Sequence, residues 1–412
     1  MEHTRILYEY SYEYSISWVQ SCTLPLRAHG RRHPLVARLM ARFVAFPPLK
    51  TAGYRPTTFD YDPPAADVAA DGAKRPGKEE WVEVFRKSIP EFKRRAAADP
   101  RVEDAEALAE KFAEEYDAHL VAVLAGDHAG LFDGAPTVLK LCKLRDDLLR
   151  RLGFADCFLS VKSTENEQAL TVLPGVLAEL DALTDPAERL LALVKGVFAG
   201  NIFDLGAATS AALYADGGGD FIATRAELKP QPWCVDDFEA LKARWLGGGG
   251  GGGYKKCVMF VDNSGADVLL GMLPLARELV RGGCEVILAA NEVPSINDIT
   301  AQELTPLLTR VASFDPVVAD AIAAGRLRVC SSGSDLPVID LSCISPGLAE
   351  AAEGVDLVVL EGMGRAIETN LYARFACDSL KLGMVKHPEV ATCLGGTLYD
   401  CVCKFDTGDG GQ

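Results

Sequence analysis

The second half of the chain alternates short apolar runs with helical stretches. The apolar runs are strand-sized and lie at 256–261, 285–290, 326–332, 356–362, 379–385 and 399–405. Helical stretches separate them near 267–281, 299–324, 345–353 and 365–374. This alternation predicts a Rossmann-like, doubly wound α/β fold, whose mainly parallel sheet is covered by helices on both faces. Ligands bind such sheets beyond the carboxyl ends of the strands.

In the first half of the chain the apolar side chains have a different spacing. Within residues 79–246, apolar side chains recur at every fourth position from 108 to 124, which is typical of a helix face. Seven consecutive glycines at 247–253 then separate this helical region from the α/β domain at 254–412. We expect the glycines to form a surface loop without regular structure. They precede a strand instead of following one, so they are not a dinucleotide or phosphate loop.

Residues 1–45 differ in charge from the rest of the chain. No acidic residue lies between Glu13 and Asp60, whereas seven basic residues do. This bias favours an extension that is disordered or directs the protein to an organelle. Residues 46–78 are rich in Pro, Gly and Ala and are expected to form a linker-like arm, so that order begins near Glu79.

The composition excludes several functional classes. The 412 residues include 42 Lys and Arg against 58 Asp and Glu, a net charge of −16, which argues against nucleic-acid and anionic membrane surfaces as partners. No apolar run reaches the length of a membrane span. The 12 cysteines form no CxxC pair or zinc spacing and are expected to be reduced thiols. We therefore expect a soluble cytoplasmic protein, with organelle targeting as the alternative.

Polar residues follow the predicted strands and should share one rim of the sheet. Asp262 and Asn263 follow the first strand, and Asp298 lies in the segment after the second. Together they offer two carboxylates and an amide, an all-oxygen set suited to Mg²⁺ or Mn²⁺. The alternative is that Asp262 and Asn263 cap the following helix and that Asp298 caps the next one.

Other candidates surround this group. The segment EGMGR at 361–365 is a strand-to-helix turn, where glycines let backbone amides approach an anion and Arg365 offers a planar donor for phosphate. Lys381 lies inside the fifth predicted strand and is either a site residue or a snorkelling lysine. Asn201 and Asp204 follow an apolar helix and either reach the site or form its C-cap and turn.

Several long segments make the chain recognisable. FVDNSGAD, AANEVPSINDIT, SGSDLPVIDL, EGMGRAIETNLYA and CDSLKLGMVKH, with AGNIFDLG upstream, resemble plant stand-alone members of the damage-control phosphatase family, which also occur as the C-terminal domain of some pantothenate kinases. The resemblance covers residues from about 46 to the end. EGMGR is the hallmark of one subfamily, although Ala366 stands where Gly is expected. The RTxK lysine of a sister subfamily falls on Lys381, and the Arg of that motif is not matched.

The resemblance implies a metal-dependent phosphomonoesterase with a metabolite damage-control role. It implies a divalent metal (Mn²⁺, Co²⁺, Ni²⁺ or Mg²⁺) and, as substrate, a small phosphorylated metabolite such as 4′-phosphopantetheine or its oxidised and damaged forms; sugar phosphates belong more to the sister subfamily. The residues assigned to metal and catalysis are Asp262, Asn263 and Asp298, with Lys381 also catalytic. The residues assigned to substrate are Asn201, Asp204, Ser264, Glu361, Arg365 and Lys381.

Three points stay open from the sequence alone. A metal-activated water and a covalent Asp262 nucleophile are both compatible with the DNS sequence, although a haloacid-dehalogenase-type enzyme would show DxD. A Rossmann-like methyltransferase or a non-catalytic phosphometabolite-binding module are the alternative functions. Self-association into a homo-oligomer is neither required nor excluded by the sequence.

Overall fold

The computed structural model describes residues 43–64, 68, 72, 74–202, 221–248 and 251–408. The predictions for residues 1–42 and for Asp204 lie outside these described residues. Within them, no helix combines the length and the apolar character that a bilayer crossing requires.

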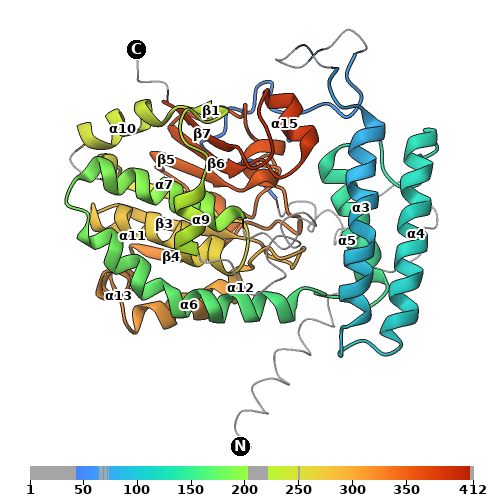
Figure 1. Cartoon of the computed structure of the whole chain (residues 1–412), viewed down its shortest axis with the longest axis horizontal. Helices are drawn as coiled ribbons and strands as arrows, with labels where there is room; N and C mark the ends of the chain where they lie inside the picture. The colour runs from blue at the N-terminus through green and yellow to red at the C-terminus, as the bar shows by residue number, and fades with distance from the viewer. Residues whose placement is uncertain are drawn as a thin grey trace, which may run out of the picture. The chain divides into compact units, whose positions relative to one another are not determined.

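A seven-stranded sheet forms the centre of the α/β part (Figure 1). Its strands are β1 (Val235–Asp236), β2 (Lys256–Phe260), β3 (Glu285–Ala290), β4 (Leu327–Ser331), β5 (Leu357–Glu361), β6 (Asp378–Met384) and β7 (Cys401–Asp406). Their order is β1-β7-β6-β5-β2-β3-β4, and every neighbouring pair is parallel except β6 and β7. The mainly parallel sheet predicted from the apolar runs is confirmed, and β1 is an added edge strand inside the region expected to be helical.

The sheet separates two hydrophobic cores. Along β2, Cys257 and Met259 face one core, whereas Val258 and Phe260 face the other. All four side chains are buried. Strands buried on both faces read as continuous apolar runs, which is why the sequence predicts their positions closely.

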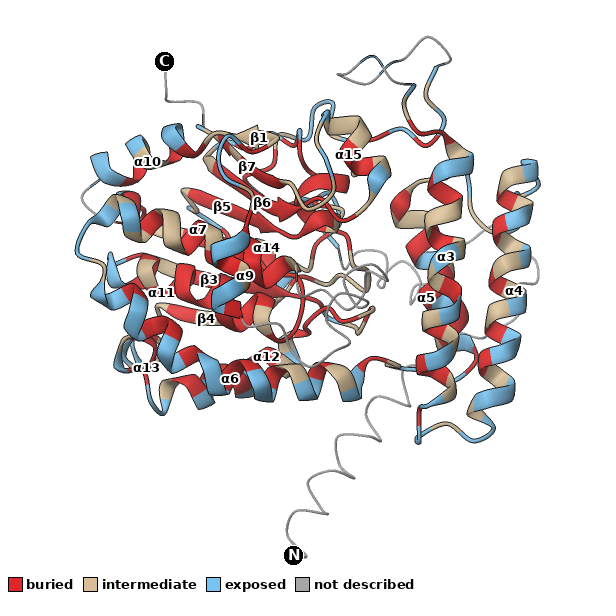
Figure 2. Ribbon diagram, viewed as in Figure 1, coloured by how far each residue is buried: buried red, intermediate tan, exposed pale blue. Residues whose placement is uncertain are grey.

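Helices cover both faces of the sheet (Figures 1 and 2). The first core contains side chains from α6 (Leu159–Ala182), α7 (Pro186–Ile202), α9 (Phe221–Glu227), α10 (Phe238–Gly247), α11 (Leu273–Arg281), α12 (Ala301–Ala312) and α13 (Pro316–Ala323). The second contains side chains from α3 (Lys78–Ala97), α4 (Ala105–Ala125), α5 (Val138–Arg151), α14 (Pro346–Ala351) and α15 (Pro388–Leu394). The N-terminal helices thus contribute to both cores.

The arm before α3 corrects a prediction from the sequence. Residues 43–64 already pack against the rest of the fold, ahead of Glu79, because apolar side chains interrupt the Pro- and Gly-rich segment. Four of them are buried in the second core: Phe46, Leu49, Phe59 and Tyr61. Backbone bridges from Val44 to Ile344 and from Leu49 to Phe375 attach the arm to the α/β part.

Two further predictions need correction. Gly251–Gly253 form a short 3₁₀ turn, and Gly251 and Gly252 are buried, so this part of the glycine run is not a surface loop. The helical stretch expected at 267–281 begins as a π-helix, η3 (Asp267–Met272). The stretch expected at 365–374 is a short π-helix, η4 (Met363–Glu368), followed by a turn. Such wide turns occur frequently at functional sites, and both lie at the rim predicted to bind ligand.

Candidate functional site

The site starts where two adjacent strands end. β2 and β5 are parallel neighbours, so the residues that follow or end them meet at one edge of the sheet. The backbone N–H of Asp262 donates to Glu361 Oε2 at 3.1 Å. Both carboxylates are buried, Glu361 completely.

A third carboxylate completes a buried acidic cluster. Asp267, the first residue of η3, joins Asp262 and Glu361, and one oxygen from each lies within 4.8 Å of the others. Burial raises the pKa of Asp267, and the positive charge of Lys386 partly opposes that rise. The negative charge of three carboxylates this close together must be compensated by hydrogen-bond donors or by a cation.

Asn201, near the end of α7, supplies part of that compensation. Its Nδ2 lies 2.8 Å from Glu361 Oε1 and 3.0 Å from Asp267 Oδ2, and its Oδ1 accepts from the Met384 N–H at 3.1 Å. Gly200 makes the approach possible, because a Cβ there would lie 2.9 Å from the Ala266 carbonyl oxygen. Asn201 is therefore brought to the predicted site rather than serving only to end its helix.

Close contacts explain why both positions between Glu361 and Arg365 that carry glycine in EGMGR have no side chain. Gly362 has φ +95°, and a Cβ at this position would lie 2.0 Å from Asp262 Oδ2. A Cβ on Gly364 would lie 2.3 Å from the Pro337 carbonyl oxygen. The motif thus lets the chain turn directly against the first carboxylate of the site.

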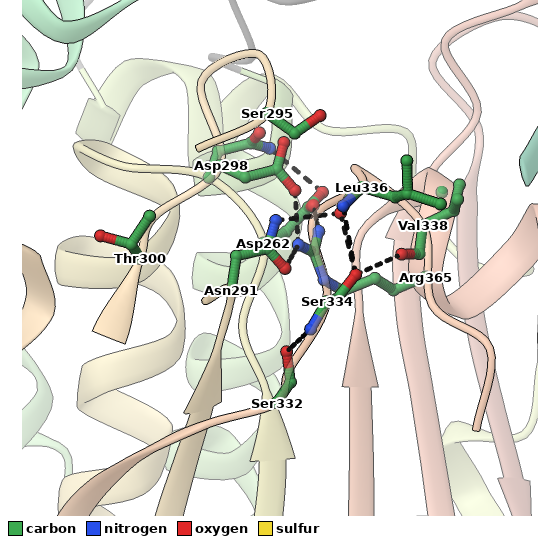
Figure 3. A network of polar contacts seen from close by, with 12 residues as sticks. Asp262, Asn291, Ser295, Asp298, Thr300, Ser332, Ser334, Leu336, Val338 and Arg365 are labelled. Carbon is green, nitrogen blue, oxygen red and sulfur yellow. Dashed lines mark hydrogen bonds and ion pairs between the residues drawn. The ribbon is translucent and has the colours of Figure 1, made fainter. Parts of the chain in front are cut away.

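Arg365 connects the two predicted acidic metal ligands (Figure 3). Its guanidinium forms ion pairs with Asp262 and Asp298, and Nη2 donates to Asn291 Oδ1 at 3.0 Å. All three charged side chains are buried. Asp298 also belongs to the rim through a backbone bridge with Asn263.

The helix-cap alternative for these residues is wrong. Thr300 caps α12, with its side chain accepting from the Glu303 N–H. Ala266 precedes η3, and that helix start has no side-chain cap. Asp262, Asn263 and Asp298 are therefore held at the rim for another reason.

Several buried polar atoms at this rim have no hydrogen-bond partner among the described residues. They are Asn263 Oδ1, Ser264 Oγ, Asp267 Oδ1 and both side-chain atoms of Asn297. Most buried polar atoms in proteins are paired, so this concentration indicates a place built for a ligand. Because the group consists mainly of carboxylate, amide and hydroxyl oxygens, it fits a hard divalent cation.

Lys381 and Lys386 have different environments. Lys381, in the middle of β6, donates to the Ala373 carbonyl oxygen at 2.8 Å and to Asp406 Oδ2 at 2.9 Å, and burial lowers its pKa. Lys386 follows the end of β6, is fully buried, and lines a cavity together with Asp262 and Asn263. Lys386, and not Lys381, is therefore the lysine beside the acidic cluster, and the catalytic role of Lys381 stays a prediction.

The sequence does carry a signal for Lys386. This lysine lies just beyond a strand, at the position where parallel sheets carry ligand-binding residues, whereas Lys381 lies inside the strand. Asp267 and Asn297 are visible in the loops after their strands, but no motif assigns them a role. Their importance comes from burial and missing partners, which a sequence does not reveal.

A comparison with protein families identifies the chain. A family model for the damage-control phosphatase ARMT1-like domain matches residues 70–402. The chain belongs to this family. The resemblance drawn from the motifs is thereby confirmed, and with it the assignment as a phosphatase of the damage-control class.

Individual relatives agree with the family. A damage-control phosphatase of Arabidopsis thaliana is 48% identical over 369 residues, covering 89% of this chain and 98% of the relative. A 4′-phosphopantetheine phosphatase of Mus musculus is 35% identical over 397 residues, and pantothenate kinase 2 of Arabidopsis thaliana is 41% identical over 372 residues. The matches to the last two cover 84% of this chain but only 47% and 40% of those longer proteins.

A solved structure supports the fold alone. The crystal structure of a DUF89 family protein from Pyrococcus horikoshii aligns with a TM-score of 0.54 at 19% identity, covering 78% of this chain and 96% of that protein. The α/β fold described above is therefore shared with that protein.

Proposed function

We propose that this chain is a metal-dependent phosphomonoesterase that removes the phosphate from 4′-phosphopantetheine and from its oxidised or damaged forms. The observation that carries the proposal is the orientation of Asn263. Its Nδ2 donates to Asp267 Oδ2 at 2.8 Å and to Asp262 Oδ2 at 3.1 Å. The opposite atom, Oδ1, is buried without a partner among the described residues, as expected of an oxygen reserved for a cation.

The metal ligands in this proposal are Asp262, Asn263 and Asp298. Asp267 and Glu361 then act behind them, Asp267 by fixing the Asn263 amide and Glu361 by accepting from the Asp262 N–H. Such outer carboxylates orient metal ligands in many proteins. The chemistry that a divalent cation supplies when bound is stabilisation of phosphoryl charge and a lowered pKa for an attacking water.

The cationic side chains complete the phosphate site. Arg365 lies between Asp262 and Asp298, so its guanidinium is positioned to bind a phosphoryl oxygen beside those carboxylates. Lys386 lines the adjoining cavity, where its charge can balance the oxygens of the transferring group. Ser264 Oγ and Asn297 Nδ2 offer further hydrogen bonds to phosphate or water.

The test is a turnover assay after chelation of the purified protein. Phosphate release from 4′-phosphopantetheine and from p-nitrophenyl phosphate is measured with no metal and with Mn²⁺, Co²⁺, Ni²⁺ or Mg²⁺. We expect no release without metal and restored release with at least one of the ions. Metal-dependent binding of 4′-phosphopantetheine without release would instead support a non-catalytic phosphometabolite-binding module.

A further inference from the structure

The cavity beside the acidic cluster has a polar floor and a mainly aromatic wall. Its volume is about 290 Å³, near the lower end of small-molecule sites at roughly 300–1,000 Å³. Asp262, Asn263 and Lys386 line the floor. The wall comes from the N-terminal arm, α3, α5 and η4 and includes Tyr61, Trp81, Phe85, Phe92, Val138 and Met363.

Ring stacking and burial hold the aromatic wall of the cavity in place. The rings of Tyr61 and Trp81 stack with centroids 4.8 Å apart and an angle of 3° between their planes. Both residues are nearly inaccessible to solvent. A substrate whose phosphate lies at the cluster must therefore place its leaving group along this preformed apolar wall.

One charged donor interrupts the wall. Arg145 of α5 is buried and lines the cavity, and its guanidinium carbon lies 4.6 Å from the centroid of the Phe92 ring. Nε donates to Asp146 Oδ1 at 2.7 Å. Nη2 is buried and has no hydrogen-bond partner within the part of the chain that the structure describes.

A second arginine is packed in the same way but lies away from the cavity. Arg95 of α3 is equally buried, its guanidinium carbon lies 4.5 Å from the centroid of the Phe158 ring, and it forms an ion pair with Glu91 at 2.7 Å. Arg95 does not line the cavity. Nε of Arg95 also lacks a hydrogen-bond partner within the described part of the chain, and Arg145 differs from Arg95 by lining the cavity.

Charge at the cavity indicates what Arg145 binds. Apart from His387, the lining residues contribute three cationic side chains and three carboxylates: Lys87, Arg145, Lys386, Asp262, Glu368 and Glu389. Asp146 already balances the charge of Arg145. With no surplus of positive charge for a second anion, a neutral oxygen acceptor is the partner that matches Nη2.

We propose that Arg145 is a specificity residue that donates from Nη2 to a neutral oxygen, an amide carbonyl or a hydroxyl, on the leaving group of the phosphomonoester. The inference rests on the proposed phosphatase function and narrows its substrate class. The preferred leaving group is an uncharged, partly apolar chain with an oxygen acceptor away from the phosphate. A leaving group with a terminal carboxylate or a second phosphate is disfavoured.

The variant test uses Arg145→Lys, which keeps the charge beside Asp146 but removes the planar donor. Arg95→Lys is the matched control. Steady-state kinetics are measured with 4′-phosphopantetheine, whose leaving group contains amides, and with p-nitrophenyl phosphate, which lacks them. For Arg145→Lys we expect an increase in KM of about tenfold or more for 4′-phosphopantetheine, with kcat little changed, and a change below about twofold for p-nitrophenyl phosphate. Arg95→Lys should leave both substrates unaffected.

Equal losses on both substrates, or no loss on either, would overturn the specificity role. A substrate comparison with the unmodified protein gives a second measurement that does not depend on folding of the variant. The protein should prefer 4′-phosphopantetheine over an n-alkyl phosphate of similar length, and over 4′-phosphopantothenate with its carboxylate, by about tenfold in kcat/KM. Equal use of all three refutes this inference alone, whereas failure to hydrolyse any phosphomonoester refutes the proposed function.

Discussion

The side-chain Nδ2 of Asn263 lies 2.8 Å from Asp267 Oδ2. This contact connects the loop after β2 with the first residue of a π-helix, four positions further along the chain. It decides which end of the Asn263 amide is available, because the nitrogen is engaged and the oxygen has no partner among the described residues. Two residues of the FVDNSGAD segment thus determine which atom of Asn263 faces the proposed metal site.

Asp267→Asn tests this orientation. An amide at 267 can donate to Asn263 Oδ1 or accept from Nδ2, so the fixed direction of the Asn263 amide is lost. We expect metal affinity to fall about 10- to 100-fold, the usual effect of removing an outer-shell carboxylate, as measured by calorimetric titration. Asp99→Asn, which alters a buried aspartate paired with Arg101 elsewhere, is the control. Unchanged metal affinity in Asp267→Asn would refute the orienting role.

Gly362→Ala tests the close approach of EGMGR to Asp262. The added Cβ would lie 2.0 Å from Asp262 Oδ2, so we expect the carboxylate to be displaced, with loss of metal binding. Gly283→Ala is a matched control, because Gly283 has φ +91° and a Cβ added there would meet no atom within 4 Å. The control should cost about 1–2 kcal/mol of stability from backbone strain alone and retain activity. Similar activity in the two variants would show that the contact with Asp262 is unimportant.

The sequence predicted the sheet well and the arm poorly, for the same physical reason. A strand such as β5, Leu357–Glu361, is buried on both faces, so its pattern is continuous and easy to recognise. In the arm, isolated side chains such as Phe46 and Phe59 enter the core between Pro and Gly residues, which leaves no period to detect. The two-residue strand β1 is likewise too short to give a pattern.

The site was predictable only in part. Asp262 and Glu361 follow or end parallel strands, and the general position of ligands in such folds was enough to select them. The position of Lys386 just beyond a strand was a signal in the sequence, whereas recognising Asn297 depends on which side chains are buried together and recognising Asp267 depends on its contact with Asn263. These facts arise from tertiary packing, so the sequence could name the rim but not all of its members.

Lys386→Met and Lys381→Met compare two fully buried lysines. Lys386 lines the cavity, so its loss should lower kcat/KM for phosphomonoesters by about 100-fold or more if it balances charge in the transition state. Lys381 is engaged by Asp406 and Ala373, so its loss should lower stability and leave kcat/KM within about twofold. Steady-state kinetics and thermal unfolding of both variants test this prediction. A large kinetic defect in Lys381→Met alone would restore the catalytic role that the sequence motif suggests for Lys381.

Acid titration should reveal the ion pair between α6 and α11. Hydrogen bonds from Arg277 at 2.8 Å lower the pKa of Asp181 to about 2. Since the unfolded value is about 3.9, the carboxylate contributes stability above that pH and loses it as the pH falls towards 2. Asp181 is partly exposed, so we expect Asp181→Asn to cost about 1 kcal/mol at pH 7.

The measurement is urea unfolding of wild type and Asp181→Asn between pH 7 and pH 2.5. The difference in the free energy of unfolding should shrink below about pH 4. A difference that stays constant with pH would mean that the variant acts through packing and not through ionisation.

Asp298→Asn and Glu361→Gln separate the two ligand sets that share Asp262. In the proposed site, Asp298 is a direct ligand and Glu361 an outer carboxylate, so Asp298→Asn should abolish metal binding and Glu361→Gln should weaken it about 10- to 100-fold. The helix-cap interpretation of Asp298 is already excluded because Thr300 caps α12, so loss of metal binding cannot be attributed to a lost cap. Calorimetric titration of both variants, with circular dichroism to establish that each is folded, gives the comparison.

If Asp298→Asn binds metal like wild type while Glu361→Gln does not bind it, the ion is held by Asp262, Asp267 and Glu361, whose oxygens lie within 4.8 Å of one another. Asp298 would then serve as the partner that positions Arg365.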